Sequence, residues 1–183
     1  MQHIFSKVRK AVEDFEMIED GDKIAVGVSA GKDSLTMLYT LSFMRRFYPK
    51  KFDVVAITVD MGFEGMDFLP IKEFCDKIDV EFHLVPSQIK QIVFDIRKEE
   101  NPCSLCANLR RGILNSTAKS LGCNKVALGH HLDDVVETFF LSLFFEGRIY
   151  CFSPKTYLDR TQITTIRPMI YLKEHDLRSA AKK

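Results

Sequence analysis

The chain has 183 residues, 46% of them hydrophobic, which is enough for one well-buried domain and leaves little room for a second. Its net charge of +1 selects no class of partner. No apolar run is long or charge-free enough to span a bilayer and the first residues lack a signal-peptide core, so we expect a cytoplasmic protein without membrane contacts.

Two features depart from this even composition. The five cysteines are an odd number for a disulfide framework, and in a reducing compartment they are expected to be free, metal-binding or reactive. Residues 147–183 carry a net charge of +5, whereas residues 1–146 carry −4. This basic end suits either contact with phosphates or a solvated surface, and the sequence alone leaves both open.

Hydrophobic periodicity predicts a lead-in helix over residues 1–22 and one α/β domain over residues 23–183. Strands are predicted at residues 24–28, 52–59, 80–85, 125–129 and 163–167, and helices at 35 to about 48, 66–78, 103–121 and 133–145. The alternation indicates a single doubly wound, Rossmann-like domain with about five parallel strands. Ligands should then bind beyond the carboxyl ends of the strands.

The loop after the first strand reads Ser29-Ala30-Gly31-Lys32-Asp33-Ser34. Small residues let backbone N–H groups point at an anion, and the positive end of the following helix lies behind them. Gly27 and Gly31 are one residue too close for a Walker loop, and the dinucleotide fingerprint G-x-G-x-x-G is absent. A left-handed backbone at Ala30 would cost about 1 kcal/mol or more, which we interpret as tolerated.

A second group of polar residues follows the strand at residues 125–129. Gly129, His130 and His131 lead into a helix whose first turn carries Asp133 and Asp134. Acidic residues there are ordinary caps, but opposite a phosphate loop they also predict a Mg²⁺ ion on a triphosphate. His131 fits either a structural residue or a zinc ligand.

The third group is the C-x-x-C pair Cys103 and Cys106, followed by Arg110 and Arg111. Such a pair fits half a zinc site, a redox dithiol, part of an iron–sulfur cluster or a persulfide carrier. No second pair completes a structural zinc site. A helix N-terminus and two arginines favour thiolates, so reactive sulfur chemistry is expected.

Residues outside these groups are assigned to the core by default. This applies to the isolated Cys75, Cys123 and Cys151. It also applies to an apolar set on the helix after Asp134, for which a dimer contact is the alternative: Phe139, Phe140, Leu143, Phe144 and Phe145.

The loop, the C-x-x-C pair and G-H-H-x-D-D-x-x-E-T, in this order, resemble the tRNA thiolation branch of the PP-loop ATPases. The tRNA 2-thiocytidine synthetases are the most similar group, over about Ala11 to Asp176. The resemblance implies that ATP adenylates the C2 oxygen of a tRNA pyrimidine, expected to be cytidine. Sulfur from a donor such as a cysteine desulfurase then replaces that oxygen, with release of AMP and pyrophosphate.

The same resemblance implies roles for particular residues. ATP phosphates would be held by Ser29, Ala30, Gly31, Lys32, Asp33 and Ser34. Val28 and Val59 would flank the adenine, Gly129 and His130 would complete the nucleotide site, and Asp60 with Asp133 or Asp134 would lie near Mg²⁺.

Members of this branch hold a [4Fe–4S] cluster through the C-x-x-C pair and a third cysteine beyond the final helix, which this chain lacks. Three explanations stay open: the chain is truncated, which we favour; Cys151 substitutes; or Cys103 and Cys106 work as a dithiol. Two other functions compete with thiolation. One is a PP-loop ligase such as a lysidine synthetase or an amidotransferase synthetase domain, which needs no cysteines. The other is a nucleotide-binding module with a C-x-x-C metal clip.

Overall fold

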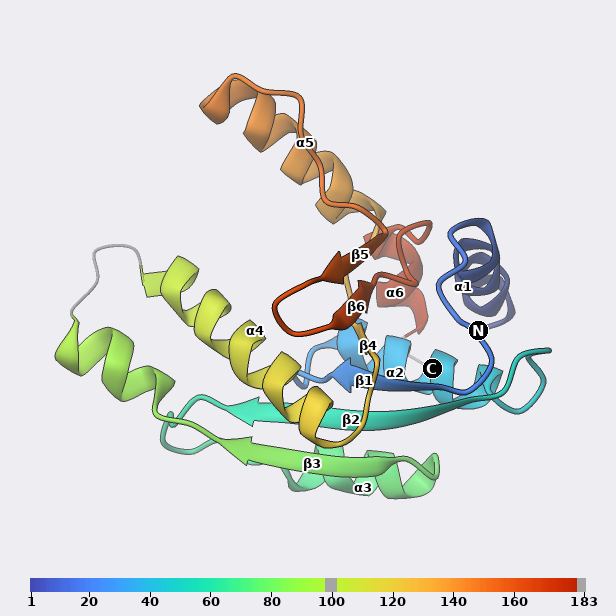
Figure 1. Cartoon of the computed structure of the whole chain (residues 1–183), viewed down its shortest axis with the longest axis horizontal. Coiled ribbons are helices and arrows are strands. Elements are labelled where there is room, and N and C mark those ends of the chain that lie inside the picture. The colour runs from blue at the N-terminus through green and yellow to red at the C-terminus, as the bar shows by residue number, and fades with distance from the viewer. Residues whose placement is uncertain (98–101, 181–183) are drawn as a thin grey trace.

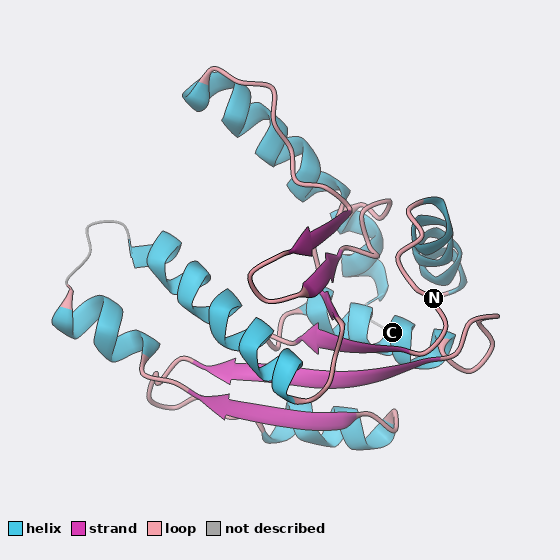
Figure 2. Cartoon of the chain, viewed as in Figure 1, coloured by secondary structure: helices cyan, strands magenta, loops and turns pink. Residues whose placement is uncertain are grey.

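The computed structural model describes residues 1–97 and 102–180, which form alternating helices and strands (Figure 1, Figure 2). The helices are α1 (Gln2–Asp14), α2 (Lys32–Met44), α3 (Leu69–Lys77), the π-helix η1 (Gln91–Ile96), α4 (Pro102–Ser120), α5 (Leu132–Glu146) and α6 (Glu174–Ala180). The strands are β1 (Asp22–Gly27), β2 (Phe52–Asp60), β3 (Glu81–Pro86), β4 (Lys125–Ala127), β5 (Lys155–Leu158) and β6 (Ile163–Ile166).

The strands form a six-stranded sheet in the order β3-β2-β1-β4-β6-β5. Every neighbouring pair is parallel except β5 with β6, which pair antiparallel. The predicted doubly wound parallel sheet is therefore confirmed, with β5 as an added antiparallel edge strand. Sequence analysis missed β5 because only four residues form it and their burial does not alternate.

Alternation along β1 distributes its side chains to the two faces of the sheet. Ile24 and Val26 belong to the core shared with α1, α2 and α6, whereas Ala25 packs with α4 on the other face. At Gly27 a Cβ atom would lie 2.9 Å from the Leu114 side chain, so the glycine lets α4 approach the strand closely. Both faces of β1 are thus buried, as expected for a central parallel strand.

The lead-in helix is part of the same core. The buried face of α1 packs in the cluster that contains α2, and a buried ion pair fixes the segment after it. Lys125 Nζ lies 2.7 Å from the Asp22 carboxylate and donates to the Met17 carbonyl at 3.0 Å. Asn124 donates to the other Asp22 oxygen at 2.7 Å. These contacts hold the start of β1 in register with β4.

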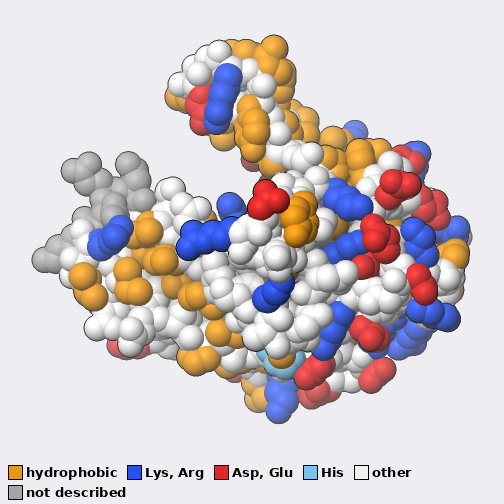
Figure 3. All heavy atoms as spheres, in the orientation of Figure 1, with side chains coloured by type: hydrophobic (Ala, Val, Ile, Leu, Met, Phe, Trp, Pro, Cys, Tyr) orange, Lys and Arg blue, Asp and Glu red, His pale blue; other side chains and the backbone are white. Residues whose placement is uncertain are grey.

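Helix α5 and the segment that returns from it, residues 132–150, stand away from the sheet and are called the α5 arm (Figure 1). The predicted burial of its apolar set is wrong for most members, because Phe144 is 73% exposed, Phe145 is 82% exposed, and Phe140 and Leu143 are exposed as well. Hydrophobic side chains gather along one side of the arm (Figure 3). Periodicity identified an apolar helix but could not say what covers it.

Within the residues that the structure describes, no helix is both long enough and apolar enough to cross a bilayer.

Candidate functional site

A cavity of about 350 Å³ lies beyond the carboxyl ends of β1, β2 and β4. This is the edge where a doubly wound sheet is expected to bind ligands. The lining comes from the loop after β1, the end of β2, the segment before α3, one side of α4 and the residues after β4. Segments far apart in the sequence therefore meet around one volume of the size of a small-molecule site.

The loop from Ser29 to Ser34 forms a closed turn at the floor of this cavity. The Ser29 amide donates to Ser34 Oγ at 3.1 Å, and Ser34 Oγ donates to the Gly31 carbonyl at 3.0 Å. The Val28 amide donates to the Ile57 carbonyl at 2.9 Å and joins the loop to β2. Ala30 has φ +60°, so the left-handed backbone anticipated at this position is present.

The loop delivers the beginning of α2 to the cavity. The first helical hydrogen bond runs from the Leu35 amide to the Gly31 carbonyl at 3.2 Å, so the amides of the preceding residues have no intrahelical partner. Together with the helix dipole, such amides bind anions. Asp33 also lines the cavity, and its buried Oδ1 has no hydrogen-bond partner, which suits a cation brought with the anion.

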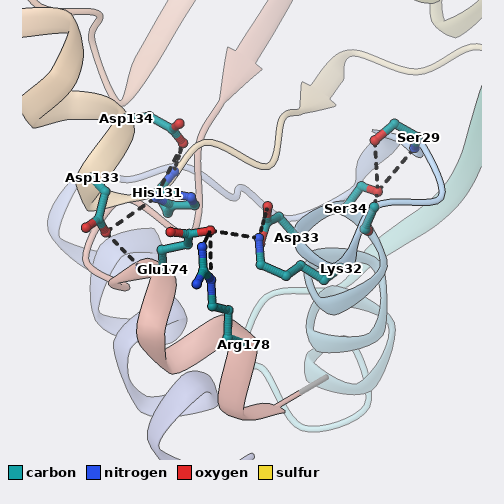
Figure 4. A network of polar contacts seen from close by, with 10 residues as sticks. Ser29, Lys32, Asp33, Ser34, His131, Asp133, Asp134, Glu174 and Arg178 are labelled. Carbon is teal, nitrogen blue, oxygen red and sulfur yellow. Dashed lines mark hydrogen bonds and ion pairs between the residues drawn. The ribbon is translucent and has the colours of Figure 1, made fainter. Parts of the chain in front are cut away.

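Lys32 is oriented away from the cavity, unlike its neighbours in the loop. Its ammonium donates to Asp33 Oδ2 at 3.1 Å and to Glu174 Oε1 at 3.2 Å, and Figure 4 shows it pointing toward α6. Ser29, Ala30, Asp33 and Ser34 line the cavity, whereas Lys32 does not. Contact between Lys32 and a phosphate therefore stays a prediction that requires the side chain to move.

One wall of the cavity is apolar and suits a flat ring. Val28 and Val59, the residues expected to flank adenine, both line it. Met61, in the segment expected to be functional after β2, lines it too, and sequence analysis missed Met66, Phe68 and Ile71. No motif marks these three residues, because the loop between β2 and α3 and the first turn of α3 place them there.

The residues after β4 form the opposite wall. Gly129 lies against the start of α2, where a Cβ atom would be 3.5 Å from the Ser34 amide. The His130 ring lies 5.0 Å from that of Phe152, and its buried Nδ1 has no hydrogen-bond partner. Burial, and next the positive charge of Arg167, hold the pKa of His130 below its usual value, so the ring is neutral at pH 7.

The three carboxylates expected near Mg²⁺ each have a partner in the fold. Asp134 accepts from the His131 amide at 2.7 Å, Asp133 accepts from the Glu174 amide at 2.8 Å, and Asp60 accepts from the Gly62 amide at 2.8 Å. Of the three, only Asp134 lines the cavity. Capping is thus their visible role, and magnesium binding stays a prediction.

The two cysteines of the C-x-x-C pair lie in the first turns of α4. Cys103 is exposed, Cys106 is half-buried, and both are free thiols. Arg110 lines the cavity and follows both cysteines on the same helix. At 1.5 Å per residue, Cys106 and Cys103 lie roughly 6 and 10 Å from Arg110 along the helix axis. The pair is therefore close to the cavity but outside it.

Cys151 does not complete this pair. Its thiol lies at the base of the α5 arm and donates weakly to the Val135 carbonyl at 3.6 Å. No three histidine, cysteine or acidic side chains come together as a metal site anywhere in residues 1–97 and 102–180. Among the other cysteines, Cys75 and Cys123 are buried as expected, and burial raises the pKa of Cys75 to about 11.

Arg167, at the end of β6, is a site residue that sequence reasoning missed. Its guanidinium lies over the Phe152 ring at 4.8 Å and donates to the Ser153 carbonyl at 2.6 Å. Its buried Nε has no partner. Burial and then the charge of Arg111 lower the pKa of Arg167. The two guanidiniums are therefore close enough to interact, and neither is paired with a carboxylate among the described residues. The sequence placed it at the end of the strand predicted at residues 163–167, with no role assigned to it in the site.

Comparison with known proteins places these features in context. The family profile of the PP-loop domain matches residues 1–183. The tRNA-cytidine(32) 2-sulfurtransferase of Geobacter sulfurreducens is 42% identical over 175 residues, which cover 95% of this chain and 68% of that protein. The same enzyme of Syntrophotalea carbinolica is 41% identical over 184 residues, which cover 98% of this chain and 71% of that protein. Across the curated relatives, the chain spans between 55% and 71% of their length.

Solved structures agree with the fold. The U34-tRNA thiolase NcsA from Methanococcus maripaludis, solved with its [4Fe–4S] cluster, superposes with a TM-score of 0.77 and 28% identity over 99% of this chain and 62% of that one. An NH3-dependent NAD synthetase from Campylobacter jejuni superposes with a TM-score of 0.59 and 18% identity, over 99% of this chain and 72% of that one. The second likeness concerns the fold alone.

Proposed function

Because this chain belongs to the PP-loop family, we propose that it is an ATP-dependent tRNA sulfurtransferase that replaces the C2 oxygen of a tRNA cytidine with sulfur. The observation that carries the proposal is a cavity lined by a loop suited to anions, with a pair of free thiols close to it on α4. Relatives more than 40% identical along nearly the whole chain are curated as tRNA-cytidine(32) 2-sulfurtransferases, which supports the same substrate.

In the first step, the residues of the cavity bind ATP and orient its α-phosphate. The amides at the start of α2 hold the phosphates, and Val28 and Val59 flank the adenine. The cytidine C2 oxygen attacks the α-phosphate, so that an O–P bond forms and pyrophosphate leaves. Mg²⁺ held with the triphosphate would neutralise charge. Asp33, Asp67 and Asp134 are the carboxylates that line the cavity, and Asp33 lies in the phosphate loop itself.

In the second step, sulfur replaces the adenylated oxygen. Hydrosulfide attacks C2, and AMP leaves with the former C2 oxygen. Cys103 and Cys106 are the residues placed to present the sulfur, since they are accessible and close to the cavity on α4. A cysteine desulfurase is the class of donor that we propose, together with a thiol reductant that releases hydrosulfide from the donor's persulfide and is itself oxidised to a disulfide. The cytoplasm is the expected place of the reaction.

The thiols of the described chain fit an iron–sulfur cluster only in part. Cys103 and Cys106 would provide two thiolate ligands, and no third ligand from the described residues joins them. A bound cluster would supply an iron atom that accepts sulfide. The cavity residues perform the same binding and orientation in either case, and no step above depends on the cluster.

The tRNA itself would enter beside Arg110, Arg111 and Arg167. These three guanidiniums come from α4 and from the end of β6, and Arg110 lines the cavity. The unpaired Nε of Arg167 suits a backbone phosphate beside the target cytidine.

The adenylation step tests this proposal directly. The chain is incubated with ATP, Mg²⁺ and unmodified tRNA, and pyrophosphate and AMP are measured with and without sulfide. We expect pyrophosphate release that depends on tRNA and AMP release that also depends on sulfide, with Gly31→Asp as a control that blocks the loop. Formation of ADP, or no nucleotide turnover with any tRNA, would contradict the proposal.

The competing function is a PP-loop ligase that activates tRNA in the same way but attaches an amine. Such a ligase needs no cysteines, so replacement of Cys103 and Cys106 by serine separates the two functions. Unchanged tRNA modification by the double variant would favour the ligase.

A second copy of the chain is the partner that we propose for the α5 arm. Phe140, Phe144 and Phe145 are exposed by 46%, 73% and 82%, together about two fully exposed phenylalanines, or roughly 300–500 Å². Further exposed side chains of the arm, Leu141, Ile149 and Tyr150, bring this toward the roughly 800 Å² per partner of a stable interface. Light scattering should give a dimer that Phe144→Ser with Phe145→Ser converts to a monomer, whereas a monomeric wild-type protein would contradict this contact.

A further inference from the structure

The hydrogen bonds around Glu174 connect the phosphate loop with α5 and α6. Glu174 Oε1 accepts from Lys32 at 3.2 Å and from Arg178 at 2.9 and 3.1 Å. The Glu174 amide donates to the Asp133 carboxylate at 2.8 Å, so the backbone of Glu174 is tied to the first turn of α5 (Figure 4). One acidic residue thus joins the lysine of the loop to the first turns of two helices.

Asp33 at 3.1 Å and Glu174 at 3.2 Å together hold the Lys32 ammonium, and Glu174 is the partner that draws it toward α6. Neither residue lines the cavity, although Asp33 and Ser34, which follow Lys32, both do. The core fixes α6 in turn, because Leu177 is fully buried and the Leu132 amide donates to the Leu172 carbonyl at 2.8 Å. Lys32 is therefore held outside the cavity by a carboxylate that cannot follow it inward.

Charge supports this arrangement. Partial burial lowers the pKa of Lys32, but the bonds to Asp33 and Glu174 outweigh it and leave that pKa above its usual value. The bonds from Arg178 and then from Lys32 hold the pKa of Glu174 below its usual value. Both groups are charged at neutral pH, so the contact is an ion pair that a phosphate must replace.

We propose that Glu174 is a positioning residue that holds Lys32 away from the nucleotide site until a triphosphate takes its place. Binding of ATP exchanges one anionic partner of Lys32 for another, and Glu174 keeps Arg178 as its counterion after the exchange. The lysine thereby contributes to phosphate binding only when a polyphosphate fills the loop. This inference rests on the proposed binding of ATP in the cavity.

The test is a double-mutant cycle on ATP binding, measured by calorimetry without tRNA. Glu174→Gln removes the competing charge and should tighten ATP binding about two- to fivefold, the range that corresponds to measured exposed ion pairs. In a Lys32→Met background the same substitution should change the affinity by less than about 1.5-fold, because no lysine is left to release. Glu13→Gln, which removes the exposed pair with Arg9 on α1, is the matched control and should change neither affinity.

Each outcome decides the matter. Unchanged or weaker ATP binding by Glu174→Gln, with a melting temperature within about 3 °C of the wild type, overturns the proposal. Equal tightening of ATP binding in the Lys32→Met background also overturns it. Direct repulsion between the Glu174 carboxylate and ATP would then explain the higher affinity without any part for Lys32. Wild-type protein that binds no ATP contradicts both this inference and the proposed function, whereas the expected cycle without AMP release contradicts the proposed function alone.

Discussion

The phosphate loop and the α5 arm are built in opposite ways. The loop joins β1 to α2, and its two ends are anchored in the core because Val28 before it and Ser34 at its end are buried, whereas Ser29 to Gly31 are exposed. The arm leaves the body of the protein, and Phe145 near its end is 82% exposed. Cys103, near the cavity, resembles the arm in its exposure. The loop side of the cavity is therefore anchored by packing within this chain, whereas Cys103 and the end of the arm are exposed.

The largest expected effect comes from truncating one side chain in each region. Leu38→Ala in α2, where the side chain is fully buried, should lower the free energy of unfolding by about 2–5 kcal/mol. Phe145→Ala in the arm should change it by less than about 0.5 kcal/mol. Urea unfolding at a protein concentration that keeps the chain monomeric measures both. Equal losses of unfolding free energy would show that Phe145 is buried within the monomer.

Thiol reactivity sharpens the same comparison. With a pKa of about 11, Cys75 is thiolate in about one molecule per thousand at pH 8, and it is also buried. Iodoacetamide should therefore alkylate Cys103 and Cys106 at least about 100-fold faster than Cys75 or Cys123. Peptide mass spectrometry over time gives the four rates. Comparable rates would mean that the core opens as easily as the first turns of α4.

The anchor of the arm should contribute a moderate amount of stability. Asp134→Ala removes the carboxylate that accepts from the His131 amide at the start of α5, and should cost about 0.5–2 kcal/mol. Glu137→Ala, at an exposed position on the same helix, is the matched control and should be nearly neutral. Thermal unfolding of the two variants measures the difference. Equal melting temperatures would show that Asp134 does not stabilise α5 as a cap.

The smallest expected effect concerns the loop. Ala30→Gly relieves a left-handed alanine and should stabilise the protein by up to about 1 kcal/mol, offset in part by the greater freedom of glycine when unfolded. Ala107→Gly, at an exposed position inside α4, should instead destabilise by about 0.5–1 kcal/mol. Chemical denaturation measures the change in unfolding free energy for both variants. A destabilised Ala30→Gly variant would mean that contacts of the Ala30 methyl group outweigh the cost of its left-handed backbone.

Sequence analysis recovered the parts of the molecule that local pattern determines. Periodicity gave the order of helices and parallel strands, and the loop motif located one side of the cavity, including the left-handed Ala30. It missed Phe68, which lines the cavity, and Arg167, which packs on Phe152, because tertiary folding alone gives isolated residues these neighbours. It also misjudged Phe144, since an apolar helix has the same pattern whether it meets the core or an outside partner. The inward role expected of Lys32 depends on Glu174, which lies 142 positions away and carries no motif.

The central claim is that the loop and the C-x-x-C pair are two halves of one reaction. One reaction mixture tests it, containing ATP, sulfide and unmodified tRNA, with pyrophosphate, AMP and 2-thiocytidine measured together for the wild type and for the Cys103→Ser, Cys106→Ser variant. We predict equal amounts of the three products for the wild type, and pyrophosphate with no 2-thiocytidine for the variant. Equal thiolation by the variant, or AMP without any thionucleoside from the wild type, would contradict the account.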